Sequence, residues 1–277
     1  MSEAGIRPEE ISVIMPVFNA GDGAALSEAV GSILGQEGVS LRLYICDDGS
    51  TDGTQALLSR LAREDDRITL ITNASNLSAG AARNRCLAQA KGQFVALMDS
   101  DDFSAPQRLL KQRDYLNARP DLSFVGTRGS FFTRTPGDTE DSYWFVRRPE
   151  KKDFLMTLPF VHASIMFRRS ALDAVGGYCE EAWALRSEDY DLMMRLYSQG
   201  LTGENLDESL YFIRMDEDTY RRRKYKFRIN EVRVKWRGFS RLGLFPKGVP
   251  YALKPLAVGL MPKGPLDRLK AAYYKDR

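Results

Sequence analysis

The sequence is poor in the residues on which many catalytic sites depend. Its 277 residues include one histidine, His162, and no G-x-S-x-G motif occurs. A Ser-His-Asp hydrolase needs its histidine beside such a nucleophile, so the sequence does not support that class of enzyme. We interpret His162 as a packing or hydrogen-bonding residue. Any general base in this protein must then be a carboxylate.

Cysteine and long apolar runs are also scarce. Cys46, Cys86 and Cys179 form an odd-numbered set without the spacing of metal ligands, and each lies in an apolar stretch. We expect them to be reduced core residues, which favours a cytoplasmic protein. The first residues lack the basic and apolar regions of a signal peptide. No apolar run reaches the ~18–20 residues that span a bilayer, so we expect no transmembrane helix.

Two nucleotide-binding motifs are absent. The sequence contains no G-x-x-x-x-G-K-[ST] loop, and no G-x-G-x-x-G fingerprint follows the first apolar run. These absences argue against kinases and dehydrogenases, whose nucleotides are bound by those glycine-rich loops.

Charge is unevenly distributed along the chain. Residues 219–277 contain 17 Lys and Arg against 3 Asp and Glu, whereas residues 1–218 contain 34 acidic and 23 basic residues. We therefore expect two parts: an acidic catalytic domain over 1–218, and a basic amphipathic extension over 219–277 that meets a polyanion.

Short apolar runs alternate with amphipathic segments along the first hundred residues. The runs predict strands and the segments predict helices, an alternation typical of βαβ units with a mostly parallel sheet. The expected strands are 11–17, 41–48, 67–72 and 93–99, and the expected helices are 24–35, 54–63 and 79–91.

Beyond residue 120 the pattern is less regular. We expect strand or hairpin structure at 122–134, 141–148 and 162–170, and a helix at 187–199. The whole chain is thus predicted to be an α/β protein with a Rossmann-like sheet flanked by helices, followed by a mainly helical basic extension.

Acidic and turn residues follow three of the expected strands, at 16–19, 47–50 and 99–102. Ligands of open α/β sheets bind at the carboxyl ends of strands. Five carboxylates at one edge repel each other unless a cation or a donor-rich ligand compensates. The run from Asp99 to Asp102 suits Mg²⁺ or Mn²⁺ bound to a diphosphate. Asp102 by itself is also explained as a helix N-cap.

Two acids open the helix expected at 187–199. Ser187 is placed to cap this helix, which leaves Glu188 and Asp189 in its first turn. They are the best-placed candidates for a general base. The alternative is that they only complement the helix dipole.

Several of these segments together resemble a known family. SVIMPVFNA, ICDDGSTDGT and, after Asn76, AGAARNRCLAQAKGQFVALMDSDD are similar to the donor-binding half of the family 2 glycosyltransferases, which have the GT-A fold. The later SEDYDLMMRL resembles the Glu-Asp motif of that family. The resemblance covers roughly residues 10–200 in the expected order and spacing.

The resemblance implies an inverting enzyme that uses Mn²⁺ or Mg²⁺. One sugar would pass from a nucleotide diphosphate donor, such as a UDP-sugar, to a hydroxyl of a glycan acceptor by single displacement. The implied roles are Pro16 and Phe18 in the nucleoside pocket, Asp48 on the base, Arg83 near the diphosphate, Asp99 on the nucleotide sugar, Asp101 on the metal, and Asp189 as catalytic base.

The sequence departs from the family pattern at two points. Leu77 stands where a glycine often follows Asn76, so the loop before the expected helix at 79–91 is predicted to differ in shape. The Gln-x-x-Arg-Trp motif of processive family members is missing. Its absence favours transfer of a single sugar over polymerisation.

The basic extension predicts where the acceptor is located. It mixes Lys and Arg with aromatics and with apolar residues such as Trp236, Phe239 and Leu242. That composition suits peripheral binding to the anionic inner face of the cell membrane, with a polyprenyl diphosphate-linked glycan as acceptor. The alternative is that these apolar residues pack on the catalytic domain. No nucleic-acid-binding motif accompanies the charge, and we expect no nucleic acid.

Two other functions remain open. A nucleotidyltransferase that makes nucleotide-sugars would share the fold type and the metal, but it needs a basic residue in the loop after the first strand, and VFNAGDGAA has none. A non-catalytic nucleotide-sugar or membrane-binding module would not need to keep both Asp101 and the Glu188–Asp189 pair.

Overall fold

The computed structural model describes residues 7–139, 142–143, 145–215 and 225–260. Its first half follows the predicted alternation of strands and helices, with boundaries that shift by a few residues. In chain order the elements are β1 (Arg7–Val17), α1 (Ala24–Leu34), β2 (Ser40–Asp47), α2 (Thr54–Glu64), β3 (Ile68–Thr72), α3 (Ala79–Gln89) and β4 (Gly92–Leu97).

The second half is less regular and adds the remaining strands. Its elements are β5 (Phe103–Ser104), α4 (Arg108–Ala118), β6 (Phe124–Phe132), the 3-10 turns η1 (Lys151–Leu155) and η2 (His162–Ser164), β7 (Met166–Arg168), α5 (Arg169–Val175), α6 (Glu188–Ser198) and β8 (Gly203–Arg214).

All eight strands form one sheet in the order β3-β2-β1-β4-β7-β6-β8-β5. The strands from β3 to β4 are parallel, and β6 is parallel to β8, whereas β7 and β5 pair antiparallel with their neighbours. The mostly parallel sheet is therefore confirmed. After β3 the chain returns to the other side of β1 to form β4, so the strand order reverses between β1 and β4. This reversal opens the crevice in which such sheets bind ligands.

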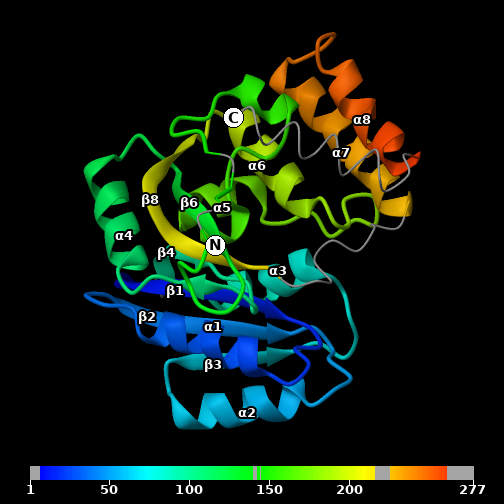
Figure 1. Ribbon diagram of the computed structural model, residues 1–277. Coiled ribbons are helices and arrows are strands. Elements are labelled where there is room, and N and C mark those ends of the chain that lie inside the picture. The colour runs from blue at the N-terminus through cyan, green and yellow to red at the C-terminus, as the bar shows by residue number, and fades with distance from the viewer. Residues whose placement is uncertain (1–6, 140–141, 144, 216–224, 261–277) are drawn as a thin grey trace.

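Alternate residues of the central strands enter two different cores. Ile11, Val13 and Met15 of β1 pack with α1, α2 and α4 on one face of the sheet, and Ile14 packs with α3, α5 and α6 on the other. Because both faces are covered, the central strands are apolar almost throughout. Figure 1 shows the sheet running between these helices.

The sequence prediction was least accurate between residues 103 and 215. Helix α4 and strand β8 were not predicted at all. The strand expected at 141–148 is wrong for the described residues, since they contain only an isolated bridge between Ser142 and Ser130. The strand expected at 162–170 shrinks to β7, because η2 precedes it and α5 begins at Arg169.

The described part of the extension consists of two helices, α7 (Tyr225–Leu242), which packs on α6, and α8 (Val249–Leu260), which packs on α7. Phe239 and Leu242 are buried in the same core as Leu192 and Leu196 of α6. These two apolar residues are thus part of the fold, and the expectation that they insert into a membrane is wrong. Residues 219–224 and 261–277 lie outside the described part.

A proline inside the extension does not interrupt its second helix. Pro255 lies inside α8 and does not end it. Within the part of the chain that the structure describes, no helix combines the length and apolar character that crossing a bilayer requires.

The packing of α7 predicts a large loss of stability on truncation of its buried face. Phe239→Ala should lower the free energy of unfolding by about 3–5 kcal/mol, since it leaves a cavity in a closed core. Trp236→Ala, on the exposed side of the same helix, should cost less than about 1 kcal/mol. Urea unfolding of both variants measures the difference. Equal effects would show that α7 is not part of the cooperative unit.

Candidate active site

The carboxyl ends of β1, β2 and β4 meet at the crevice where the strand order reverses. The Asp48 backbone N–H donates to the Val17 carbonyl, at 2.8 Å, and links the ends of β1 and β2. Beyond them, Asn19 donates its backbone N–H to the Ser50 hydroxyl, at 2.9 Å. Since β4 also pairs parallel with β1, the three strand ends predicted to share one edge of the sheet are brought together. Of the two residues assigned to the nucleoside pocket, Phe18 is exposed at this edge and Pro16 is half-buried.

Asp48 is buried and faces the loop that leads into α3. Its Oδ1 accepts hydrogen bonds from Asn73 Nδ2 (2.8 Å) and the Leu77 N–H (3.0 Å), and its Oδ2 accepts one from the Ser78 N–H (2.9 Å). A carboxylate has about four acceptor positions, so three of them are used within the protein. Asp48 therefore stabilises the conformation of this loop. Its predicted hydrogen bond to the nucleobase of the donor stays a prediction.

Leu77 does not need the conformation of a glycine. The positive φ in this loop belongs instead to Ser78, at 129°, whose hydroxyl accepts from the Ala81 N–H at the start of α3. Gly49 packs against the same loop, where an added Cβ would lie 2.6 Å from the Ser75 Cα. The close approach of the two backbones therefore explains why a residue without a side chain occupies position 49.

Arg83 and Asp99 form an ion pair at this edge of the sheet. The guanidinium of Arg83 on α3 is buried and lies 2.6 Å from Asp99 Oδ1, just after β4. Burial alone would lower the pKa of Arg83, but the neighbouring Asp99, Tyr178 and Glu188 raise it above the ordinary value. Arg83 is therefore a permanent positive charge among acids, as a diphosphate site requires. Its Nε has no hydrogen-bond partner in the described structure.

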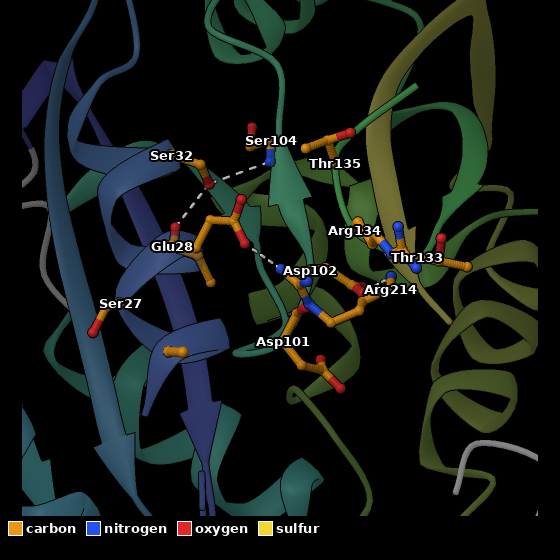
Figure 2. Close-up of polar contacts among 12 residues, drawn as sticks. Ser27, Glu28, Ser32, Asp101, Asp102, Ser104, Thr133, Arg134, Thr135 and Arg214 are labelled. Atoms are coloured by element: carbon orange, nitrogen blue, oxygen red, sulfur yellow. Dashed lines mark hydrogen bonds and ion pairs between the residues drawn. The ribbon is translucent and has the colours of Figure 1, made fainter. Parts of the chain in front are cut away.

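The two aspartates after Ser100 have opposite environments. Asp102 is buried, and its carboxylate accepts hydrogen bonds from the Tyr211 hydroxyl (2.8 Å) and the Arg214 N–H (2.9 Å). Burial, together with the negative charges of Asp101 and Asp99, raises the pKa of Asp102 well above its ordinary value. No helix begins at Asp102, so its interpretation as a helix N-cap is wrong. Asp101 is exposed, and Figure 2 shows its carboxylate directed away from Asp102 and Arg214.

These surroundings fit a divalent cation that the donor helps to hold. Among the described residues, no three His, Cys, Asp or Glu side chains are close enough to form a metal site. Mg²⁺ and Mn²⁺ bound with nucleotides commonly take only one or two carboxylates, and substrate phosphates and water complete their shell. The exposed Asp101 beside the crevice suits that arrangement.

The candidate base lies at the start of α6. Asp189 is half-buried, and its Oδ1 accepts from the Tyr190 N–H at 2.7 Å. Glu188 is buried, and its Cγ is 3.1 Å from the position that a Cβ on Gly80 would occupy. The start of α6 therefore contacts the start of α3. Ser187 occupies the N-cap position, but its side chain makes no cap hydrogen bond, so the predicted cap is absent.

Tyr178 connects the two groups of acids, and the sequence prediction missed it. Burial raises its pKa, Arg83 lowers it, and Asp99, Asp189 and Glu188 raise it further, so all four charges act on this phenol. Asn84 holds the backbone of Tyr178 through two hydrogen bonds of 2.9 Å. No motif marks Tyr178 in the sequence, because only the fold brings it to Arg83.

His162 has the hydrogen-bonding role expected for it. Its Nε2 lies 3.2 Å from the Tyr178 hydroxyl, and the two rings meet edge to face. Burial and the nearby charge of Arg83 hold the pKa of His162 well below its ordinary value, so the ring is neutral.

Comparison with known proteins decides between the open functions. The model of Glycosyl transferase family 2 matches residues 12–176. The chain belongs to glycosyltransferase family 2. This membership favours a glycosyltransferase over the nucleotidyltransferase alternative, and it confirms the GT-A fold expected from the sequence.

Relatives of this glycosyltransferase match over most of its length. EpsE of Bacillus subtilis (strain 168), named as a glycosyltransferase, is 35% identical over 269 residues, which cover 97% of this chain and 94% of EpsE. WfaP of Escherichia coli, a UDP-Glc:α-D-GlcNAc-diphosphoundecaprenol β-1,3-glucosyltransferase, is 26% identical and covers 82% of this chain and 85% of its own.

A solved structure shows the same fold. The mannosyltransferase PcManGT of Pyrobaculum calidifontis, in complex with GDP-Man and Mn²⁺, matches 97% of this chain and 80% of its own with a TM-score of 0.60, at 20% identity.

The neutral His162 predicts a pH dependence of stability. In the unfolded chain its pKa is about 6.5. The folded pKa is lower, so the unfolded state binds the extra proton, and stability is complete above about pH 6.5 and falls as the pH falls towards the folded pKa. The slope attributable to this group is about 1.4 kcal/mol per pH unit.

The chain has no other histidine, and the difference between the wild type and His162→Gln removes the contribution of the carboxylates, including Asp102, from the comparison. Urea unfolding at several pH values from about 5 to 7.5 should show this slope in the wild type and in Tyr178→Phe, and its loss in His162→Gln. An unchanged slope in His162→Gln would contradict a neutral imidazole in the folded state.

Proposed function

We propose that this protein is a metal-dependent, inverting glycosyltransferase that transfers one sugar from a UDP-sugar to a hydroxyl of a lipid-linked glycan in surface-polysaccharide synthesis. The observation that carries the proposal is the cluster around Tyr178. There the Arg83 guanidinium pairs with Asp99 at 2.6 Å and lies 5.6 Å from the centroid of the Tyr178 ring. The side chains of Glu188 and Tyr178, from the second half of the chain, both pack against Gly80 at the start of α3.

Donor and acceptor are proposed from the site and from the relatives. Arg83 supplies the positive charge that a diphosphate requires, and WfaP, whose name gives UDP-Glc and a diphosphoundecaprenol acceptor, supports both substrate classes. The Mn²⁺ bound with GDP-Man in PcManGT supports a cation beside the donor diphosphate.

In this mechanism each charged side chain has one task. Asp189 takes the proton from the acceptor hydroxyl as its oxygen attacks the anomeric carbon. Arg83 stabilises the charge that develops on the leaving diphosphate. Asp101 would hold Mn²⁺ or Mg²⁺, which supplies further neutralisation of that charge. A single displacement inverts the anomeric configuration, so no carboxylate nucleophile is needed.

Two substitutions test these roles. Asp189→Asn keeps the shape of the side chain and removes the proton acceptor, so kcat should fall by about 10²–10⁴-fold with little change in donor affinity. Asp101→Asn should abolish the effect of Mn²⁺ on UDP-sugar binding measured by calorimetry. Release of the nucleoside diphosphate from a panel of nucleotide-sugars identifies the donor.

Asp114→Asn is the matched control, because Asp114 is an exposed carboxylate on α4, paired with its neighbour Arg113. It should leave both measurements unchanged. Near-normal turnover in Asp189→Asn would assign the base to Glu188 or Asp191. Equal donor affinity with and without Mn²⁺ in the wild type would reject the metal.

We further propose that the extension binds the anionic inner face of the cell membrane. Along α7, Tyr225, Ile229, Arg233 and Trp236 follow one another at helical spacing and are all exposed. The only acid between residues 225 and 260 is Glu231, which pairs with Arg228 (3.4 Å) and Lys235 (3.2 Å). The exposed side of the helices thus presents aromatics and an excess of basic over acidic residues, which suits an anionic interface.

Flotation with liposomes tests this surface without removing the buried face of α7. The wild type should bind vesicles that contain phosphatidylglycerol, release at high salt and ignore neutral phosphatidylcholine vesicles. Each cation at the interface contributes about 1 kcal/mol, so Arg233→Glu/Lys247→Glu/Lys254→Glu should abolish binding. The control Arg60→Glu/Arg63→Glu/Arg113→Glu makes the same change of net charge on α2 and α4 and should bind normally. Binding lost equally in both would contradict a localised surface.

A further inference from the structure

The end of β8 is bonded to the loop that carries the site aspartates. We define the aspartate loop as residues 98–104. The Arg214 Nε donates to the Asp101 carbonyl, at 2.8 Å, and the Arg214 backbone N–H donates to Asp102 Oδ1, at 2.9 Å. Three residues earlier in β8, the Tyr211 hydroxyl donates to Asp102 Oδ2 and accepts from the Asp99 N–H, at 3.2 Å. Two residues of β8 thus contact Asp99, Asp101 and Asp102.

The Arg214 side chain is itself held on two sides. Its guanidinium lies over the ring of Phe132, 4.4 Å from the centroid, and forms an ion pair with Glu28 on α1. Figure 2 shows Glu28 and Arg214 side by side, with Asp101 and Asp102 next to them. A planar guanidinium can donate to the carbonyl and to Glu28 at the same time, because its N–H groups point in fixed, different directions.

Tyr211, which holds Asp99 and Asp102, is itself fixed by buried contacts. Tyr211 is fully buried, and the guanidinium of the buried Arg108 lies 5.2 Å from the centroid of its ring. Arg108 in turn donates to the Leu97 carbonyl, at the end of β4, at 3.1 Å. The aspartate loop is therefore fixed from inside at Asp99 and Asp102, whereas Arg214 fixes the backbone of the exposed Asp101.

We propose that Arg214 is a positioning residue that fixes the main chain of Asp101, so that its carboxylate faces the donor diphosphate and its cation. The effect of Arg214 on catalysis rests on the proposed function, but the positioning of the Asp101 main chain does not depend on any ligand. A role in overall stability is a poor alternative, because ion pairs with partly exposed partners contribute little to it.

The decisive experiment is hydrogen exchange of the ligand-free protein. In Arg214→Ala, amides of the aspartate loop should exchange about 10–100-fold faster, while those of β1, β2 and β3 stay unchanged. Arg214→Lys keeps the charge but cannot bond Asp101 and Glu28 together, so its loop should also exchange faster. Arg128→Ala is the matched control, because Arg128 likewise lies over an aromatic ring, Phe145, and pairs with Asp207, yet it has no bond to the loop.

Turnover provides a second readout. Partners that orient metal ligands typically change metal affinity by about 10–100-fold. The Mn²⁺ concentration for half-maximal turnover should rise by that factor in Arg214→Ala, and kcat should recover at high Mn²⁺. A merely structural role would instead lower the melting temperature without a shift of the Mn²⁺ dependence.

The outcomes separate the two proposals. The positioning role is overturned if the amides of the aspartate loop exchange at the wild-type rate in Arg214→Ala. It is also overturned if Arg128→Ala accelerates their exchange as much as Arg214→Ala does. If the aspartate loop exchanges faster in Arg214→Ala but turnover of the wild type does not depend on Mn²⁺, the positioning role is supported. The same result rejects the metal in the proposed function.

Discussion

Repulsion among carboxylates at one edge of the sheet is the constraint on which the site depends. Asp48 and Asp102 are buried and Asp99 is partly exposed, and each has its own donors: Asp48 the backbone N–H groups of the loop before α3, Asp99 the guanidinium of Arg83, and Asp102 both Tyr211 and Arg214. Buried charges without such partners would be strongly unfavourable. Asp101 is the exposed member of the set, and it is the one that suits a cation brought by a substrate.

The donors to Asp102 come from the second half of the chain, which links the irregular part of the fold to the acids that follow β4. Strand β8 runs parallel to β6 and ends beside the aspartate loop, where Tyr211 and Arg214 reach it. Helix α6 starts against α3, and Tyr178 lies between the two groups of charges. Strand β8 therefore does more than extend the sheet, since its Tyr211 and Arg214 hold the loop that follows β4.

The extension combines two roles that its composition alone could not separate. Phe239 and Leu242 complete the core beside α6, whereas Tyr225, Ile229 and Trp236 stay exposed among cations. The same helix can thus stabilise the catalytic domain and present a basic, aromatic surface.

The sequence by itself determined the βαβ half, the shared edge of Asp48, Asp99 and Asp101, and the helix that begins at Glu188, because local periodicity and strand-end positions depend on neighbours in the chain. Only the tertiary structure decided that Asp102 is a buried acceptor, that β8 exists as a strand, and that Phe239 is a core residue. The partners of these residues, Tyr211, the strand β6 and the helix α6, are distant in sequence. No local pattern specifies such partners, since contacts across 40 to 110 residues form only when the sheet and its covering helices assemble.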